Sequence, residues 1–325
     1  MHRSWQLSVA FTLAGVCTLM LPAHAQDVYP VKPVRIVIPL GPGNSVEIVT
    51  RLVADKLTQT LGQPFLIEPQ PGASGQIGTE RVARATPDGY TLLAANDGIM
   101  TMLPNLQKNV RYAPMRDFAP ITQMVGIPFA LIAHPSVPAR TTHELIQLTK
   151  RQPGKLEFSS GGNGSAQHLA MELFMRQTGA VLLHVPYKGA PQAALDVVGG
   201  QIPVAFAGVP IVAAMIKAGR LKGLGLASPK RLALIGDVPT LAEQNVPFNF
   251  EAWAGLFAPA GTSAEIVAKL NVEAVKALRS RDVQSRIADF GFENSGSTPA
   301  RFAQTLKSDY ARMAEVITVA GVKLE

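Results

Sequence analysis

The sequence has a single cysteine, Cys17, among its 325 residues, and this residue falls within the first 25, which have the pattern of a secretory leader. Without that leader the chain has no thiol, which excludes disulfides, thiolate catalysis and cysteine metal ligands. The remaining histidines contain no H-x-x-H or H-x-x-x-H pair; they are His134, His143, His168 and His184. We therefore expect neither a metal nor a cofactor.

Long apolar runs and charge clusters are also missing after the leader. No run approaches the ~20 residues that cross a bilayer. The 30 Lys and Arg against 23 Asp and Glu give a net charge of +7, but basic residues are scattered, with nothing longer than Lys150-Arg151 or Lys230-Arg231. Without a basic patch or interleaved aromatic residues, nucleic-acid binding is excluded. A mildly positive surface fits a small anionic ligand better.

The leader itself combines Arg3, an apolar run over 5–21 and the small-residue site Ala23-His24-Ala25. This pattern predicts a signal peptide, residues 1–25, cleaved after Ala25. Cys17 follows Val16, where a lipid-attachment box requires a small residue, which argues against a lipoprotein. We expect an exported, soluble protein.

The most informative stretch of the chain is 158–189. A short apolar run leads into Gly161-Gly162-Asn163-Gly164-Ser165, and a helical pattern starts at once with His168 and Leu169. A strand, glycine turn and helix N-terminus bring unpaired N–H groups and the positive end of the helix dipole together, which suits a carboxylate or phosphate. A tight connection that uses glycine only for its backbone freedom explains the motif equally well.

The same strand, glycine loop and helix plan occurs near the start of the chain, at 34–62, which predicts an α/β protein. The apolar stretch 118–135, broken by Gly126 and Pro128, predicts a strand that passes from one domain into another. No strand-rich stretch is evident after residue 227, so the amphipathic helices there are expected to pack on the first domain. This organisation predicts a discontinuous domain (26–126 and 227–325), an inserted domain (127–226), and a hinge near 121–130 and 221–227.

Six collinear segments carry a family resemblance. They are YPVKP with VRIVIPLGPG (29–43), PGASGQIGTERVARATPDGYTLL (71–93), SSGGNGSAQHLAMELF (159–174), HVPYKGAPQAALDVVGGQ (184–201), DVPTLAEQNVP (237–247) and WAGLFAPAGTSAEIVAKLN (253–271). Over nearly the whole chain after the leader, the protein resembles the exported solute-binding receptors of tripartite tricarboxylate transporters, the Bug or TctC-like receptors. The resemblance implies a two-lobed type II periplasmic-binding-protein fold, with two Rossmann-like domains joined by crossing hinge strands. It also implies a periplasmic monomer that closes on a small carboxylate and presents it to integral-membrane transporter subunits.

In this family, backbone N–H groups, ordered waters and hydroxyls of two glycine loops hold the ligand carboxylate. The resemblance assigns ligand binding to positions in these loops and around them: Gly43, Asn44, Ser45, Asn96, Asp97, Gly162, Asn163, Gly164, Ser165, His168, Tyr187 and Ala207. His168 matches the family histidine and either meets the ligand or orients the loop. Tyr187, with Lys188 beside it, would line the far side of the cleft.

Three positions depart from the family pattern. Asn44 replaces a usual glycine, Glu47 a usual aspartate, and Ala207 an aspartate that many members have after the strand. Without that aspartate the site lacks a counter-charge for a ligand ammonium, so the resemblance favours a carboxylate whose distal part is neutral or apolar. Glu47 could supply the missing charge if its side chain reached the cleft.

Two other functions fit parts of the sequence. A hydrolase would use Ser165 with His168 or His184 and an acid such as Asp97, but no G-x-S-x-G elbow exists and no third group holds a base. A sensory domain that signals to a membrane partner would share every feature of a transport receptor, and the sequence leaves that alternative open. We expect no catalysis.

Overall fold

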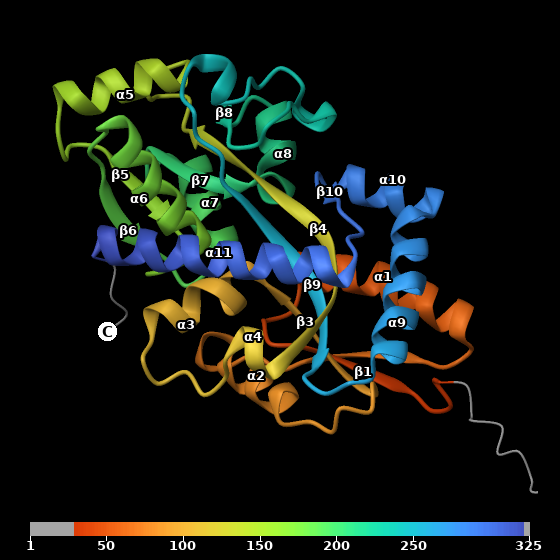
Figure 1. Cartoon of the computed structure of the whole chain (residues 1–325). Coiled ribbons are helices and arrows are strands. Elements are labelled where there is room, and N and C mark those ends of the chain that lie inside the picture. The colour runs from red at the N-terminus through yellow and green to blue at the C-terminus, as the bar shows by residue number, and fades with distance from the viewer. Residues whose placement is uncertain (1–28, 322–325) are drawn as a thin grey trace, which may run out of the picture.

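The computed structural model describes residues 29–321 (Figure 1). The predicted leader and its cleavage after Ala25 lie outside these residues. The strands are β1 Val34–Ile38, β2 Phe65–Pro69, β3 Thr91–Asn96, β4 Phe118–Ala133, β5 Glu157–Ser160, β6 Leu183–Pro186, β7 Val204–Gly208, β8 Lys222–Leu226, β9 Glu251–Pro259 and β10 Glu293–Asn294. The helices are α1 Ser45–Leu61, α2 Gln76–Ala83, α3 Leu103–Leu106, α4 Pro114–Asp117, α5 Thr142–Arg151, α6 Ala166–Thr178, α7 Ala190–Val198, α8 Val209–Lys217, α9 Ala264–Arg279, α10 Arg281–Asp289 and α11 Pro299–Ala320.

The strands form one continuous path in the order β2-β1-β3-β9-β4-β7-β5-β6, with β10 and β8 also paired to β4. β1 is parallel to β2 and β3, and β5 is parallel to β6 and β7, so each half of the sheet has its own parallel set. Helices connect the strands within each set, which confirms the predicted α/β class. Each half has the βαβ organisation that the two glycine-loop units predict.

Strand β4 joins the two halves. Its first part, Phe118–Pro128, pairs with β9, and its second part, Phe129–Ala133, pairs with β7. The stretch predicted to pass between domains is therefore a single strand. The division into domains at residues 126 and 226 stays a prediction.

The segment that leads the chain back from the second half of the sheet to the first differs from the one expected from the sequence. Residues 221–227 were expected to form it, but β8 pairs with the second part of β4 and, through Leu226, with Thr240. The central strand β9, which pairs with both β3 and β4, lies in the C-terminal third, where no strand was expected. Figure 1 shows β4 and β9 running side by side through the middle of the molecule.

Helix starts follow the sequence signals closely. Thr141 caps α5 by accepting the Glu144 N–H at 3.1 Å, and Thr298 caps α11 in the same way. Each side-chain cap satisfies a backbone donor that the first helical turn leaves unpaired. Helices α5 and α11 therefore begin directly after their threonine caps.

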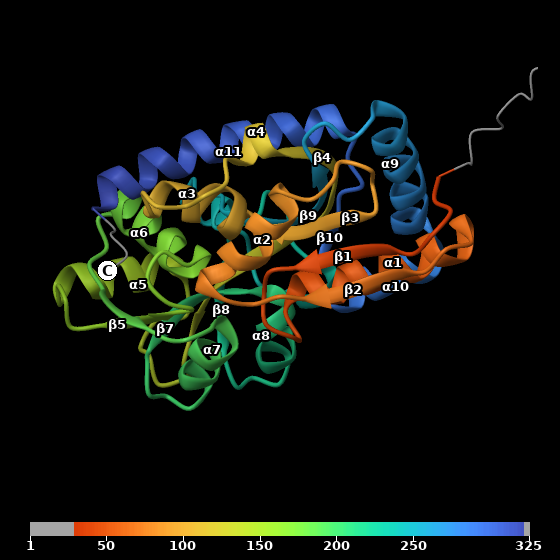
Figure 2. The same ribbon diagram turned by 90° about the horizontal axis from the view of Figure 1, so that it is seen from below.

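Helix α11 lies along β4 and β9 and reaches α3 and α6 at its far end (Figures 1 and 2). The largest apolar cluster is continuous from Ile36 in the first half to Phe174 and Phe206 in the second. In the part of the chain that the structure describes, no helix has the length and hydropathy needed to span a membrane.

Candidate functional site

The carboxyl ends of the two parallel sets meet at the middle of β4. Asn96, at the end of β3, is opposite Ala254 of β9, which is opposite Val125 of β4. Gly208, at the end of β7, is opposite Phe129 of the same strand. Ligands of open α/β sheets bind beyond the carboxyl ends of the strands, so this register indicates where to look for a site.

The first glycine loop forms hydrogen bonds with the first turn of α1, which directly follows it. Asn44 caps α1 by accepting the Glu47 N–H at 3.0 Å, and the Gly43 N–H donates to the Glu47 carboxylate at 2.7 Å. Arg51 donates to the same carboxylate, and this bond and that of Gly43 hold the pKa of Glu47 below its usual range. Glu47 is thus committed to the loop and to Arg51. Ser45 begins the helix and is half-buried.

The second glycine loop also uses some of its N–H groups internally. The Gly162 N–H donates to Ser160 Oγ at 3.1 Å, and the Gly164 N–H donates to Nδ1 of His168 at 3.0 Å. The Ser165 N–H donates to the Gly162 carbonyl. The glycine amides at positions 162 and 164 are therefore engaged with the protein itself.

The donors that remain at this loop lie at the start of α6. Ser165 Oγ accepts the His168 N–H at 3.3 Å, which leaves its hydroxyl hydrogen able to donate outward. The N–H groups of Ala166 and Gln167 occupy the first two helical positions, where an α-helix offers no carbonyl partner. With the exposed Asn163 beside them, these groups can receive an anion at the positive end of the helix dipole.

His168 is turned inward. It is 6 % exposed, its Nδ1 accepts from Gly164, and its ring stacks on that of His184 with centroids 3.8 Å apart. Of the two roles left open by the sequence, this geometry corresponds to orienting the loop. The Ser165 hydroxyl bonds the backbone of His168 and not its ring, so the Ser–His arrangement of a hydrolase is not assembled there.

A different Ser–His contact does exist, between Ser160 Oγ and Nε2 of His184 at 2.6 Å. Ser160 is fully buried at the end of β5, and its hydroxyl also bonds Gly162. A substrate cannot reach it. From the sequence, His184 was a candidate only for a hydrolase, and Ser160 was not a candidate for any role. A serine within a short strand does not indicate which side chain it will hydrogen-bond.

Tyr187 lies against the second loop through its backbone. Its carbonyl oxygen is 3.0 Å from the position of a Cβ on Gly162, and its hydroxyl donates to Asp196 Oδ2 at 2.6 Å. That bond to a carboxylate raises the pKa of Tyr187 to about 12. The structure thus brings together Gly162, Gly164, His168 and Tyr187, while the phenol is directed to α7.

The side chains of Asn96 and Asp97 lie in different surroundings. Asn96 is half-buried, and its Oδ1 accepts the Ile99 N–H at 3.1 Å. Asp97 is 4 % exposed, and burial, with the nearby Asp309 as the next cause, raises its pKa to about 7. Ala207 is also buried, in an apolar cluster with Ala130. For these residues a direct role in ligand binding stays a prediction.

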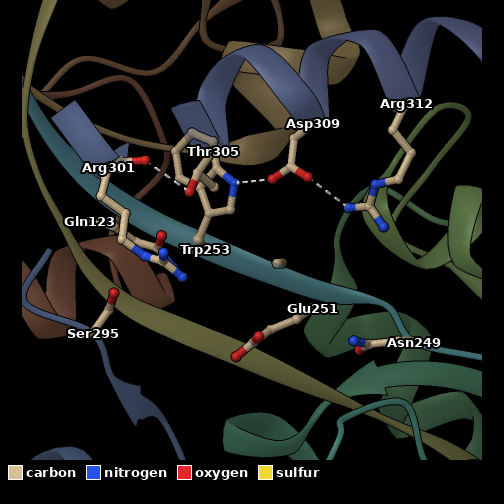
Figure 3. Close-up of a pocket in the computed structure, with 10 residues that line it drawn as sticks. Gln123, Asn249, Glu251, Trp253, Ser295, Arg301, Thr305, Asp309 and Arg312 are labelled. Atoms are coloured by element: carbon tan, nitrogen blue, oxygen red, sulfur yellow. Dashed lines mark hydrogen bonds and ion pairs between the residues drawn. The ribbon is translucent and has the colours of Figure 1, made fainter. Parts of the chain in front are cut away.

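A polar cavity of about 380 Å³ lies between β9 and α11 (Figure 3). In Figure 3 Asp309 accepts from Trp253 Nε1 at 2.9 Å and from Arg312 at 3.0 Å. Glu251 enters the cavity from the start of β9. No sequence motif indicates this cavity, because its residues come from segments far apart in the chain. Among the described residues, no group of His, Cys, Asp and Glu is arranged to hold a metal ion.

Known proteins share this fold and sequence. The family model described as "Tripartite tricarboxylate transporter family receptor" matches residues 49–322. Protein BugT of Bordetella pertussis is 32 % identical, with all of both chains covered. The solved structure of R. palustris Rpa4515 with adipate has a TM-score of 0.82 and 29 % identity, covering 91 % of this chain and 99 % of that one.

MatC from Rhodopseudomonas palustris, solved with bound malate, has a TM-score of 0.78 and 31 % identity, covering 89 % of this chain and 100 % of its own. These matches confirm the predicted type II periplasmic-binding-protein fold and the predicted resemblance. They support a solute-binding role, since the matching family model is described as a receptor and two of the solved structures hold carboxylates. The chain belongs to the tripartite tricarboxylate transporter receptor family.

Proposed function

We propose that this protein is a periplasmic receptor that binds a small carboxylate between its two lobes and delivers it to the membrane subunits of a tripartite tricarboxylate transporter. The ligand carboxylate lies at the N-terminus of α6, where it accepts from Ser165 Oγ and from the N–H groups of Ala166 and Gln167. No covalent chemistry is involved.

One observation carries the proposal: donors without protein partners at the start of α6 lie beyond the carboxyl end of β5, in a chain whose family and solved relatives are receptors. Hydrogen bonds from such groups to a carboxylate are charge-assisted and act together with the helix dipole. The adipate of Rpa4515 and the malate of MatC are small carboxylates of the kind that these donors would hold.

The rest of the ligand is expected to carry no positive charge. Ala207 offers no counter-charge at the end of β7, and Glu47 is engaged with Gly43 and Arg51, so its longer side chain does not supply the missing one. Burying an ammonium without a partner costs several kcal/mol. Aliphatic or aromatic mono- and dicarboxylates should therefore bind better than aspartate or glutamate.

A thermal-shift panel tests the proposal. It compares adipate, malate and benzoate with aspartate and glutamate, and with hexane-1,6-diol as the uncharged analogue of adipate. A carboxylate at about 100 times its dissociation constant should add ~2.7 kcal/mol to the free energy of unfolding, while the diol adds nothing. If no carboxylate stabilises the protein at millimolar concentration, the function is wrong. If an α-amino acid stabilises it and the deaminated acid does not, the argument from Ala207 is wrong.

Delivery to a transporter is the second part of the proposal and is supported by the description of the family model. Uptake of the best ligand by cells with and without the gene tests it. A loss of ligand-induced gene expression with unchanged uptake would favour the signalling alternative.

A further inference from the structure

Three rings are stacked directly beneath the second glycine loop. The imidazoles of His168 on α6 and His184 on β6 are 3.8 Å apart at an angle of 12°, and the ring of Phe158 on β5 lies 4.8 Å from that of His184. His168 and Phe158 are buried. The stack therefore connects the helix that follows the loop with the two strands at its base.

Each histidine fixes a different glycine of the loop. His168 accepts the Gly164 N–H through Nδ1, at 3.0 Å. His184 acts through Ser160, whose Oγ is 2.6 Å from Nε2 of the ring, accepts the Gly162 N–H at 3.1 Å and donates to the Gly162 carbonyl at 3.0 Å. The N–H and carbonyl groups of Gly162 and the N–H group of Gly164 are therefore all hydrogen-bonded to Ser160 or His168.

The proton positions follow from these bonds. We assign the one hydroxyl proton of Ser160 to the Gly162 carbonyl, which makes Nε2 of His184 the donor to Ser160 Oγ. His168 has no proton on Nδ1, so its proton is on Nε2, which lies 3.5 Å from Glu172 Oε1. A ring that accepts through Nδ1 is neutral, as is the case for His168. Burial, together with His168, lowers the pKa of His184 to about 4, which agrees with a neutral ring.

The loop needs such support because of its backbone. Gly162 and Gly164 have φ values of +123° and +72°, which side-chain-bearing residues rarely adopt. On its other side the loop packs closely on two neighbours. The Tyr187 carbonyl is 3.0 Å from the position of a Cβ on Gly162, and a Cβ on Gly164 would clash with Leu106 of α3. A glycine-rich loop is costly to order, and a binding loop that is already ordered saves that cost when the ligand arrives.

We infer that Ser160, His168 and His184 are positioning residues for carboxylate binding. They hold residues 161–165 in the one shape that directs Ser165 Oγ and the first N–H groups of α6 toward the ligand. None of the three touches the ligand. The inference rests on the proposed function, because it concerns the same carboxylate site.

Substitutions that keep or remove a single acceptor test the inference. His168→Asn places an amide oxygen near the position of Nδ1 and can still accept from Gly164, whereas His168→Leu cannot. We expect the leucine variant to bind adipate and malate about tenfold more weakly, the loss of one hydrogen bond, and the asparagine variant to stay within about threefold of the parent. Ser160→Ala, which frees Gly162, should weaken binding as His168→Leu does.

His134→Leu is the matched control. His134 also bonds a serine, Ser136, through Nδ1 at 2.7 Å, but it lies in the turn after β4, away from the glycine loop. This variant should leave the affinity unchanged.

Hydrogen exchange of a peptide covering 158–174, in the unliganded protein, gives a readout that needs no ligand. Exchange there should rise in His168→Leu and Ser160→Ala and stay at the parental level in His168→Asn. If the parent binds adipate or malate and His168→Leu binds it equally well with unchanged exchange, the positioning role is refuted. It is also refuted if His168→Asn fails in the same way as His168→Leu while melting at the parental temperature. If the parent binds neither acid, the proposed function itself fails and this inference fails with it.

Discussion

A pair of half-buried carboxyl groups on β9 and β10 should make the stability of the protein fall as the pH rises through about 7. Glu251 and Glu293 meet over Gly126 of β4, where a Cβ would clash with Glu251 Oε1. Burial, followed by the charge of the neighbouring Glu293, raises the pKa of Glu251 to about 7. Lys230, 3.8 Å from Glu293, acts in the opposite direction but is largely exposed.

The direction in which stability changes with pH follows from the number of protons bound by the folded and the unfolded protein. Between pH 4.5 and about 7 the folded protein keeps a proton on Glu251 that the unfolded chain has lost. This contribution to the free energy of unfolding is fully present below pH 4.5 and is lost as the pH rises through about 7. One pKa unit corresponds to about 1.4 kcal/mol, so a group with a pKa near 7 loses that much between pH 6 and 8. Because Glu251 is only partly buried, solvent screening reduces the expected loss to about 1 kcal/mol.

Glu251→Gln is the informative change, because glutamine is similar in shape, can donate to Glu293 and does not titrate. Urea unfolding at pH 6 and pH 8 should show a smaller loss of stability for this variant than for the parent, by about 1 kcal/mol. The buried Trp253, the one tryptophan outside the predicted leader, reports unfolding through its fluorescence. Glu315→Gln on the exposed side of α11 is the control. Equal losses in the parent and in Glu251→Gln would show that the pair does not share a proton.

Two further predictions concern the ligand. Ser165→Ala should weaken adipate binding by about tenfold to a hundredfold in calorimetry, since it removes a charge-assisted donor. The control Ser263→Ala removes an N-cap bond of the same 3.3 Å length from α9 and should lower the stability without changing the affinity. Equal affinities of Ser165→Ala and the parent would place the carboxylate elsewhere. If β4 acts as a hinge, small-angle scattering should show a smaller radius of gyration with saturating ligand, and an unchanged radius with proven binding would contradict the hinge.

The α/β class and most helix starts could be predicted because their signals are local. Buried strands such as β1 are β-branched at every position except the exposed Arg35, and caps such as Thr141 and Thr298 act within a few residues of themselves. Strand β9 has no such signal. Its sequence, EAWAGLFAP, is rich in alanine, with no valine or isoleucine, and it becomes a strand through pairing with β3 and β4 on its two edges. Strand formation there depends on tertiary contacts more than on intrinsic preference.

The two glycine loops could be located from the sequence, but the hydrogen bonds of their N–H groups could not. Glycine loops before helices mark where N–H groups gather, and the sequence located both loops. Which N–H groups are already engaged depends on Glu47 in the first loop, and on Ser160 and His168 in the second. Ser160 and His184, on neighbouring strands, lie far apart in the sequence, so their contact exists only after the sheet has formed.

Strand alternation explains why Asn96 and Asp97 could not be placed together. Successive side chains of β3 point to opposite faces: Leu92 and Ala94 join the cluster that contains α1 and α9, while Leu93 and Ala95 join the cluster with Trp253 under α11. Asp97 continues the second series and comes near Asp309 and Arg312. Asp97 and Glu251 therefore lie in the same acidic region, and Asp309 raises the pKa of both. Like that of Glu251, the contribution of Asp97 to the free energy of unfolding is lost as the pH rises through about 7. Since both parent and Glu251→Gln retain Asp97, its contribution cancels when their pH dependences are compared.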